Sequence, residues 1–375
     1  MEEWKEYKLG EVAIPVRDRI ETSYLDSFSY ISTENMLPNK AGVTLSSGIP
    51  SGNAIKFKNG DVLISNIRPY FKKIWRADKV GGCSADVICL RASKEIEPLF
   101  LYYLLSQDLF FDYVMQGAKG TKMPRGDKNQ IMQWPIMLPS IKEQQGISAI
   151  LKSLDDKIEV NRQINDNLEQ QGQSLFEEFV MNPNSPRTQL LGDYAFINPA
   201  RTIAKGRTAR CIDMSSLPTK GTFPNDWTFK EYNGGMKFQN GDTIMARITP
   251  CLENGKTAYI NFLDEGEVAF GSTEYIVLSP QDGLCPELLY FLARHDDFVS
   301  YAVAHMNGSS GRQRVSGNDI ANYVMPEISS ETMNVISEKL HGIMEVIKNN
   351  SLESRCLAEL RDTLLPRLMS GELKL

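Results

Sequence analysis

Two loops of this chain combine the residue types that contact phosphate groups and the edges of bases. They are residues 117–126 and 308–317, and each holds three glycines and several cations but no acidic residue. Glycine lets a backbone approach a ligand closely, its N–H groups can face phosphate, and lysine or arginine supplies charge. Arginine also matches guanine in the major groove, and glutamine matches adenine. The loop side chains predicted to contact nucleic acid are Lys119, Lys122, Arg125, Arg312, Gln313 and Arg314.

A single loop of this kind is as compatible with an ordinary exposed turn as with a binding site, but its recurrence favours nucleic acid. Lys128, just after the first loop, adds a further cation. Arg68 and Arg247 stand beside a repeated Ile-x-Pro motif and are secondary candidates for contact with nucleic acid. These two arginines are equally compatible with surface ion pairs.

The loops recur because the chain repeats itself. Residues 57–61, Phe-Lys-Asn-Gly-Asp, return as residues 238–242, Phe-Gln-Asn-Gly-Asp. Further matches follow in the same order: Ile67 and Pro69 with Ile248 and Pro250, Ser84 with Ser272, Pro98 with Pro286, and Gly117, Gly120, Gly126 and Pro135 with Gly308, Gly311, Gly317 and Pro326. A repeat unit of this length is one whole domain plus a connector, not a solenoid or propeller repeat. Two similar but unequal halves suggest a ligand with two similar but unequal parts.

The two blocks that carry the loops, residues 1–140 and 188–329, are predicted to be mixed α/β (α+β) domains. Short β-rich runs occur at residues 61–64 and 85–90 and recur at residues 242–245 and 274–278. In each block one helix should follow the strands, from Pro98 to about Met115 and from Pro286 to about Met306, since proline suits the first turn of a helix. The aromatic pairs Tyr102-Tyr103 and Tyr290-Phe291 within these helices are expected in the core.

Each block is followed by a long helix, at residues 141–181 and 330–375, with a linker at 182–187. Apolar residues step by four and three along both segments, which is the pattern of a coiled coil rather than of a helix lying on a sheet. Ser140 with Glu143 forms a capping box at the first helix start, and Pro183 and Pro186 end it. The seam positions are Ile147, Leu151, Leu154, Ile158, Asn161, Asn165, Leu168, Gly172, Leu175 and Phe179, and then Ile336, Leu340, Ile343, Ile347, Asn350, Ser354, Leu357, Arg361, Leu364 and Leu368.

Both seams become polar at the same place, at Asn161 and Asn165 in the first and at Asn350 and Ser354 in the second. These positions lie near the midpoints of the helices, so an antiparallel pair would bring the polar layers together. A buried polar layer costs stability but fixes register. The alternative is two separate helices, each with a frayed polar middle; the coincidence under the repeat favours the paired helices.

The sequence shows no catalytic or metal-binding motif. The three histidines, His295, His305 and His341, lack ligand spacing. Residues 254–257, Asn-Gly-Lys-Thr, imitate the end of a P-loop without its first glycine. Residues 155–157, Asp-Asp-Lys, imitate a nuclease cluster but are expected on the exposed face of a helix. We therefore predict a chain that is not an enzyme and that carries no metal or cofactor.

The bulk properties are those of a globular protein of two domains. The chain has 375 residues, 42% of them hydrophobic, and a net charge of −6. Most of the excess acid lies in the first long helix, so a basic face remains possible on either globular block. There is no run that predicts a membrane span or a signal peptide, and the six cysteines are scattered. We expect reduced thiols, a cytoplasmic location and no membrane contact.

With these parts in place, the chain resembles the specificity subunit of type I restriction-modification enzymes. Residues 136–144, Ile-Met-Leu-Pro-Ser-Ile-Lys-Glu-Gln, are similar to the family's entry into its first helix. The C-terminal run at residues 360–373, LRDTLLPRLMSGEL, is a more specific match. The second half departs from the first motif, because residues 326–331 contain no Glu-Gln pair. The resemblance extends over essentially the whole chain.

The resemblance implies a non-catalytic DNA reader. Each globular block would be a target recognition domain for one half of a bipartite sequence in double-stranded DNA. The paired helices would set the spacing and dock two modification (methyltransferase) subunits, and restriction (translocase/nuclease) subunits would join the complex. S-adenosylmethionine, ATP and Mg would belong to those partners. The alternative is a structural coiled-coil scaffold whose α/β domains bind protein or carbohydrate.

Overall fold

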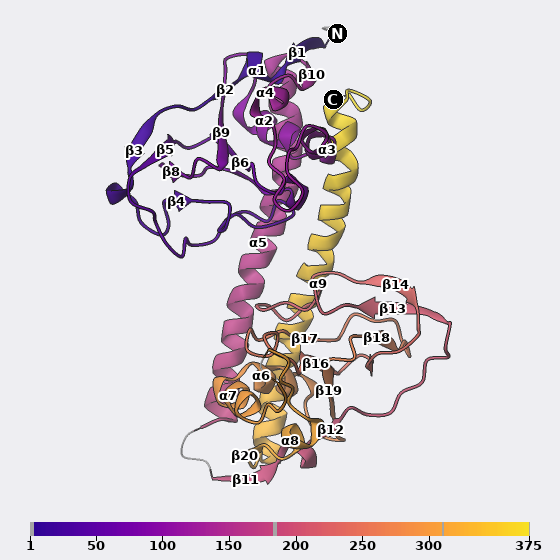
Figure 1. The fold of residues 1–375 in the computed structure, drawn as a ribbon. Helices are drawn as coiled ribbons and strands as arrows, with labels where there is room; N and C mark the ends of the chain where they lie inside the picture. Colours follow the sequence, from indigo (N-terminus) through magenta and orange to yellow (C-terminus); the bar gives the residue numbers. More distant parts are fainter. Residues whose placement is uncertain (1–3, 183–185, 310, 375) are drawn as a thin grey trace. The chain divides into compact units, whose positions relative to one another are not determined.

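The structure, a computed structural model, describes residues 4–182, 186–309 and 311–374 (Figure 1). By its internal contacts the chain divides into two compact units, Met1–Asp156 with Leu357–Leu375, and Lys157–Cys356. The domain boundaries predicted from sequence stay predictions, because these contacts join each globular block to parts of both long helices. Residues 183–185 of the predicted linker and Ser310 of the second loop lie outside the described residues.

The first unit contains two four-stranded sheets and a separate pair of strands. One sheet has the order β2-β9-β6-β7 and is antiparallel, and the other has the order β3-β5-β8-β4, with β4 parallel to β8. The separate pair is β1 with β10. The strands are β1 Lys5–Lys8, β2 Ala13–Pro15, β3 Arg19–Glu21, β4 Tyr30–Ile31, β5 Asn53–Phe57, β6 Val62–Ser65, β7 Ile74–Arg76, β8 Gly81–Cys83, β9 Val87–Ala92 and β10 Pro135–Leu138.

The second unit repeats this arrangement with one change at an edge. Its sheets have the orders β12-β19-β16-β17 and β14-β13-β18-β15, and β11 pairs with β20. In the second sheet β13 is parallel to β18, as β4 is to β8, but the fourth strand joins the opposite edge. The strands are β11 Arg187–Leu190, β12 Ala195–Ile197, β13 Thr208–Ile212, β14 Thr228–Glu231, β15 Lys237–Phe238, β16 Thr243–Ala246, β17 Thr257–Tyr259, β18 Ala269–Gly271 and β19 Tyr275–Pro280, with β20 at Val324–Pro326.

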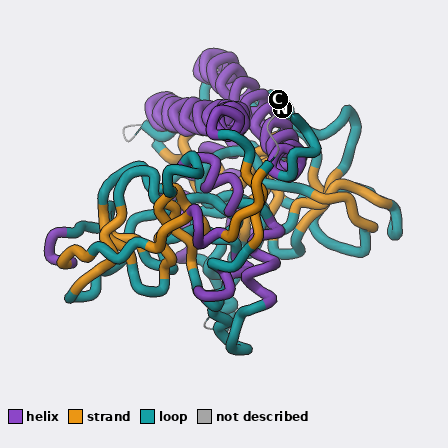
Figure 2. The backbone as a smooth tube through the Cα atoms, turned by 90° about the horizontal axis from the view of Figure 1, so that it is seen from above, coloured by secondary structure: helices purple, strands orange, loops and turns teal. Residues whose placement is uncertain are grey.

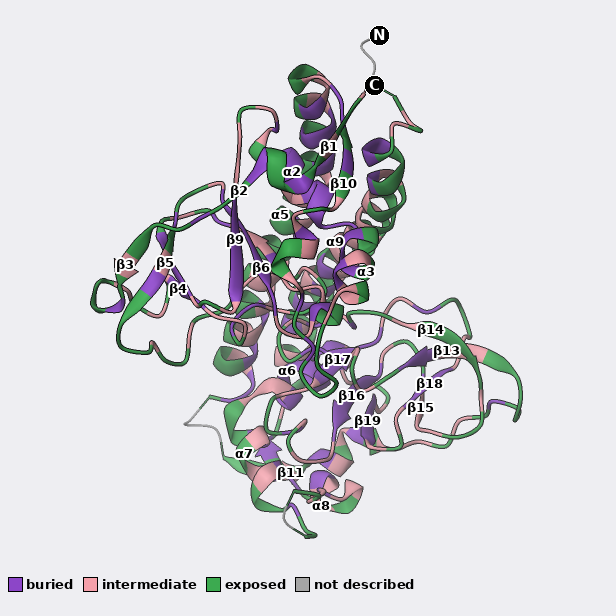
Figure 3. Cartoon of the chain, turned by 45° about the horizontal axis from the view of Figure 1, so that its top comes forward, coloured by how far each residue is buried: buried purple, intermediate pink, exposed green. Residues whose placement is uncertain are grey.

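The central strands are buried on both faces, as their continuous apolar runs require (Figure 3). In β6, Val62 and Ile64 join the core under the helices, whereas Leu63 joins a second core between the sheets. In β16, Met245 joins the core under the helices, and Ile244 joins the second core between the sheets. Side chains alternate across a strand, so one strand supplies two cores. Long loops connect the strands in both units (Figure 2).

The single helix predicted after the strands of each block is wrong, because the chain forms two helices there. They are α2 Pro98–Leu105 and α3 Asp108–Gln116 in the first unit, and α6 Pro286–Arg294 and α7 Asp296–Ala304 in the second. At the first break the Ser106 hydroxyl donates to the Tyr102 carbonyl at 2.7 Å, and Gln107 is extended. At the second, His295 Nδ1 accepts from the Asp297 N–H at 3.2 Å and caps the new helix.

The two long helices are α5, Ile141–Phe179, and α9, Ser330–Met369. In each unit a part of α5 lies antiparallel to a part of α9 (Figure 1), as the seam predicts. Ile147, Leu151 and Leu368 enter the core of the first unit, and Ile336 and Leu340 that of the second. No helix in the described ranges is long and apolar enough to cross a membrane.

Candidate nucleic-acid interface

Each predicted DNA-contacting loop forms a short hairpin. In the first, the backbones of Lys119 and Arg125 exchange two hydrogen bonds of 2.9 Å. In the second, Asn307 and Arg314 exchange the same two bonds, also at 2.9 Å. Each hairpin is attached to the end of a central strand, where Arg68 N–H donates to the Pro124 carbonyl at 2.8 Å and Thr249 N–H to that of Gln313 at 3.1 Å. The two hairpins therefore occupy equivalent places in their units.

These bonds correct the glycine correspondence predicted from sequence. Arg125 is equivalent to Arg314, so Gly126 stands where the second unit has Val315, not Gly317. The short helices that follow, α4 Lys128–Ile131 and α8 Gly317–Ala321, begin at equivalent N-caps, Asp127 and Ser316. A side chain at Gly126 would meet Asn66 and Val114 at 2.9 Å, which is why glycine stands there. The second hairpin is one residue longer, and this insertion displaces its glycines.

The base of each hairpin is held by an ion pair that sequence reasoning missed. Arg314 Nε lies 2.8 Å and 3.0 Å from the two carboxylate oxygens of Glu274, and its Nη2 lies 2.7 Å from one of them. Arg125 Nη2 lies 3.4 Å from Asp86. Both carboxylates follow a repeated serine whose hydroxyl accepts from their own N–H, Ser84 and Ser272. The signal available in the sequence was an acid two residues after each of these serines.

The charge of Glu274 is stabilised at this position. The hydrogen bonds from Arg314 hold the pKa of the Glu274 carboxyl below its usual value, and the charges of Arg314 and Arg247 add to this effect. Arg314 therefore has a structural partner in the absence of DNA. Its predicted role in reading bases stays a prediction, and its position makes it an anchor of the hairpin.

The hairpin tips carry the cations that project into solvent. Lys122 and Arg312 are exposed and form no ion pair within the described residues. Lys119 pairs with Asp127 at 3.1 Å, and the half-buried Gln313 is held through its carbonyl. Lys128, at the start of α4, donates to the carbonyl of Ala85 at 3.4 Å.

The two arginines beside Ile-x-Pro are not equivalent. Arg68 adopts the left-handed conformation, with φ 50° and ψ 61°, directly before the 3-10 turn Pro69–Phe71. Arg247 directly follows β16, and its N–H donates to the Glu274 carbonyl at 3.0 Å, as Asn66 N–H donates to that of Asp86 at 2.9 Å. Arg247 is thus the counterpart of Asn66. The Nε atoms of both arginines are buried without a hydrogen-bond partner in the described part of the chain.

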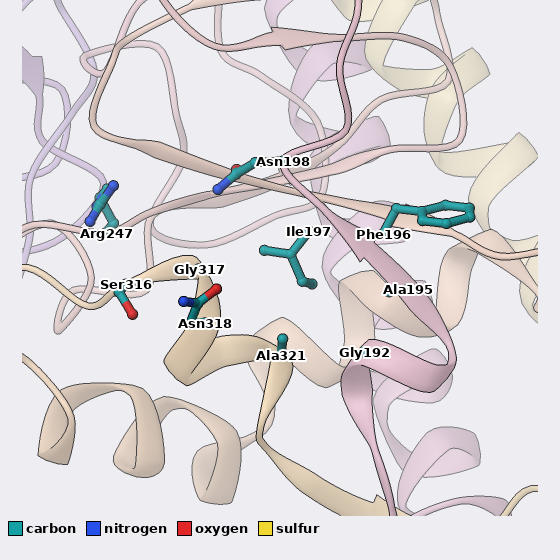
Figure 4. Close-up of a pocket in the computed structure, with 10 residues that line it drawn as sticks. All are labelled: Gly192, Ala195, Phe196, Ile197, Asn198, Arg247, Ser316, Gly317, Asn318 and Ala321. Atoms are coloured by element: carbon teal, nitrogen blue, oxygen red, sulfur yellow. The ribbon is translucent and has the colours of Figure 1, made fainter.

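A pocket of about 600 Å³ lies beside Arg247 in the second unit (Figure 4). It opens between β12, the end of β16 and α8. Its lining residues are Gly192, Ala195, Phe196, Ile197, Asn198, Arg247, Ser316, Gly317, Asn318 and Ala321. Within the described ranges no cluster of His, Cys, Asp and Glu could hold a metal ion.

The four polar seam residues meet in the second unit. Asn161 Nδ2 donates to the Asn350 carbonyl at 3.3 Å and to Ser354 Oγ at 3.2 Å. Asn350 Nδ2 donates to Asn165 Oδ1 at 2.9 Å. Asn161 is 1% exposed, and these bonds satisfy its Nδ2, whereas its Oδ1 is buried without a partner among the described residues. A register shift would break them, which is how a polar layer fixes the alignment of two helices.

The Glu-Gln motif at the first helix start has a structural reason. The buried Gln144 side chain accepts from the Glu97 N–H at 2.8 Å and donates to the carbonyls of Glu95 and Pro139 at 3.1 Å and 3.0 Å. It therefore joins α5 to the start of α2. In the second unit, where the motif is absent, Met333 Sδ lies 3.4 Å from the Cys285 N–H and contacts the start of α6 in the same way.

Comparison with known proteins agrees with this architecture. A family model described as "Type I restriction modification DNA specificity domain" matches residues 1–170. The HindI specificity subunit of Haemophilus influenzae is 22% identical over 460 aligned residues that cover 100% of both chains. The MjaIX specificity subunit of Methanocaldococcus jannaschii is 26% identical over 312 residues, which cover 73% of this chain and 69% of that protein.

The fold has a counterpart among solved structures. The S subunit of a type I restriction-modification system from M. genitalium superimposes with a TM-score of 0.59 and 16% identity, covering 98% of this chain and 96% of that one. The two proteins therefore share a fold of sheet-rich blocks joined to long helices. In sequence, this chain is similar to the specificity subunits of type I restriction-modification systems, and the family's domain model matches residues 1–170.

Proposed function

We propose that this chain is the DNA sequence-recognition subunit of a type I restriction-modification complex. Each globular block reads one half of a bipartite target in double-stranded DNA, and the paired helices set the distance between the halves. The observation that carries this proposal is the pair of hairpins. Their bases are anchored by equivalent backbone bonds and equivalent ion pairs, whereas their tips differ in length and side chains.

A common base with different tips is what two readers of different half-sites require. The anchored base fixes where the tip lies, which reduces the conformational freedom lost on binding. The exposed tip residues, Lys122 in one hairpin and Arg312 in the other, are free to contact base edges or phosphates. The same protein frame thus presents two different surfaces to DNA.

The relatives are named as specificity subunits of restriction enzymes, which supports a role in recognition rather than catalysis. We place methyl transfer and cleavage on partner subunits: two modification subunits docked on the paired helices, and restriction subunits in the full assembly. S-adenosylmethionine, ATP and Mg then bind to those partners. The complex acts on cellular DNA, so we place it in the cytoplasm.

The proposal is tested by the sequence preference of the complex with its modification subunits. Methylome sequencing of the host identifies the methylated bipartite sequence. Binding is then measured at one fixed salt concentration on a duplex with this sequence and on a duplex with both halves scrambled. We expect a preference of at least 10³-fold, on the order found for specific DNA-binding proteins. Equal affinity for both duplexes would contradict the proposal.

A further inference from the structure

The pocket beside Arg247 has a polar and an apolar end. Figure 4 shows Arg247, Asn198, Ser316 and Asn318 gathered at one end, with Phe196 directed away at the other. Arg247 is half-buried, and its Nε has no hydrogen-bond partner in the described part of the chain. Its Nε is buried, so what the side chain offers to a ligand that enters the pocket is the positive charge of the guanidinium.

The carboxylates close to this end are already occupied. Glu274 is bound by Arg314, and Asp319 accepts hydrogen bonds from the N–H and the hydroxyl of Ser316, at 3.1 Å and 2.5 Å. Arg314 thus compensates the charge of Glu274, whereas Asp319 keeps its charge and directs one oxygen toward Ser316. The polar end of the pocket keeps the positive charge of Arg247, and the chemistry that fits it is an anion.

The first unit supplies a cation at the equivalent place from a different residue. Asn66 replaces Arg247 there, but Lys128 replaces Gly317 and reaches the carbonyl of Ala85, beside Asp86. The charge is thus kept beside the same turn although the residue that carries it has changed. The two units keep a positive charge at this turn with different residues. This suggests that both bind the same kind of ligand there, because a requirement of packing would keep the residue and not only its charge.

The same comparison explains why the pocket is open in the second unit. Met132 is the counterpart of Ala321, and its side chain lies against Gly10, the counterpart of the pocket residue Gly192. A methionine at this position fills the space that alanine leaves empty. The first unit therefore presents its cation at the surface, and the second presents it in a recess.

We infer that the pocket beside Arg247 binds a backbone phosphate of the DNA, and that Lys128 contacts the equivalent phosphate in the first unit. This inference rests on the proposed function. The contact is independent of base sequence, because phosphates are alike at every step. It positions each block on the duplex so that the adjacent hairpin tip meets the bases.

The test uses the complex with modification subunits and measures DNA affinity across a series of salt concentrations. Each phosphate contact contributes about one unit to the slope of log affinity against log salt. We expect Arg247→Gln to lower the slope by about one and the affinity by on the order of tenfold at ~50 mM salt. The loss should be equal for the target and the scrambled duplex.

Two further variants separate phosphate binding from folding. Ala321→Met introduces the residue of the first unit, closes the pocket without removing charge, and should lower the slope as Arg247→Gln does. Ala321→Ser leaves the pocket open and is the matched control, with an unchanged slope. The double variant Arg247→Asn with Gly317→Lys transfers the first unit's arrangement to the second and should restore the slope.

An unchanged slope in both Arg247→Gln and Ala321→Met would overturn the inference. So would a loss confined to the target duplex, since that would make Arg247 a reader of bases. The proposed function is tested separately, by the preference of the unaltered complex for its target over scrambled DNA. The two failures can be told apart. The unaltered complex can lack a preference for its target while Arg247→Gln still lowers the salt slope. Equally, the salt slope can be unchanged in Arg247→Gln while the unaltered complex prefers its target.

Discussion

The two units bury the aspartate of the same Asn-Gly-Asp turn but pair it with arginines from different places in the fold. In the first unit Asp61 pairs with Arg91 of β9 at 2.8 Å. In the second, Asp242 pairs with Arg201, which follows β12, at 2.5 Å. Burial still raises the pKa of the Asp242 carboxyl, despite the opposing effect of Arg201. Both units therefore retain a buried aspartate paired with an arginine, but the arginine comes from a different position in each unit.

A second difference concerns how the blocks contact the helix pair. Tyr103 of α2 donates its hydroxyl to Asp155 at 2.7 Å, and Asp155 pairs with Arg361 of α9 at 2.8 Å. At the equivalent place in the second unit Phe291 has no hydroxyl and packs directly on Gly172 of α5. One contact is a polar chain and the other a close aromatic contact. The two blocks differ at this one position, although the second block has a polar contact of its own, in which Tyr290 and Arg294 of α6 donate to Glu169 of α5.

The largest expected effect breaks the buried aspartate pair in the second unit. Arg201→Ala leaves Asp242, 1% exposed, without its partner, and should cost about 3–5 kcal/mol of the free energy of unfolding. Arg91→Ala should cost less, because the Arg91 side chain is 28% exposed and water can replace it. Urea unfolding of both variants measures the difference. Equal losses would show that the two pairs are energetically alike.

A smaller effect is expected at the aromatic contact. A Cβ at Gly172 would lie 2.3 Å from Phe291, so Gly172→Ala should destabilise the chain by about 1–3 kcal/mol through overpacking. Gly342 of α9 is the matched control, since a Cβ there meets nothing within 4 Å. Gly342→Ala should raise stability by about 0.5–1 kcal/mol, as alanine does within helices. Thermal unfolding of both variants checks the opposite signs.

The hairpin anchors should matter more for recognition than for stability. Glu274→Gln removes the charge that holds Arg314, so the second hairpin loses its fixed position. Discrimination at one half-site should fall about tenfold, comparable to one base contact. Asp86→Asn should do the same to the other half-site. Competition binding with duplexes altered in a single half measures this, and a loss at both halves from either variant would argue against separate readers.

The smallest effect is a dependence of stability on pH at the same ion pair. Because Arg314 lowers the pKa of Glu274 in the folded chain, this carboxyl stabilises the fold fully above its ordinary value of 4.5. That stability is lost as pH falls through the lowered pKa. Comparison of the native chain with Glu274→Gln should show a difference in thermal stability at pH 7 that shrinks below pH ~4. A difference in thermal stability that grows as the pH falls would contradict a lowered pKa of Glu274 in the folded chain.

Much of the frame is predictable from sequence, because it follows from periodicity. The four–three spacing of Ile147 to Phe179 requires a helical seam, and the polar positions Asn161 and Asn350 meet in the structure. The apolar runs at residues 62–64 and 87–90 form buried strands in the centre of a sheet. Period and composition are local properties, so one sequence reveals them.

The features that the sequence did not predict depend on individual contacts, which leave no periodic pattern in the sequence. The breaks at Ser106 and His295 arise from side chains that cap the backbone, and the apolar spacing runs through both. The glycine match failed because an insertion in the second hairpin shifted glycines that serve its turns. The anchors Asp86 and Glu274 lie far in sequence from the arginines they hold. Such contacts become visible only when the sheets bring distant turns together.

The central claim is that each unit reads one half of the DNA target. Its most direct test is a binding library in which each half-site is randomised separately, measured with the complex carrying Lys122→Ala or Arg312→Ala. The account predicts that each variant relaxes the preference at one half-site, a different one for each, and leaves the other half unchanged. If either variant altered both half-sites alike, the assignment of one reader to each unit would be contradicted.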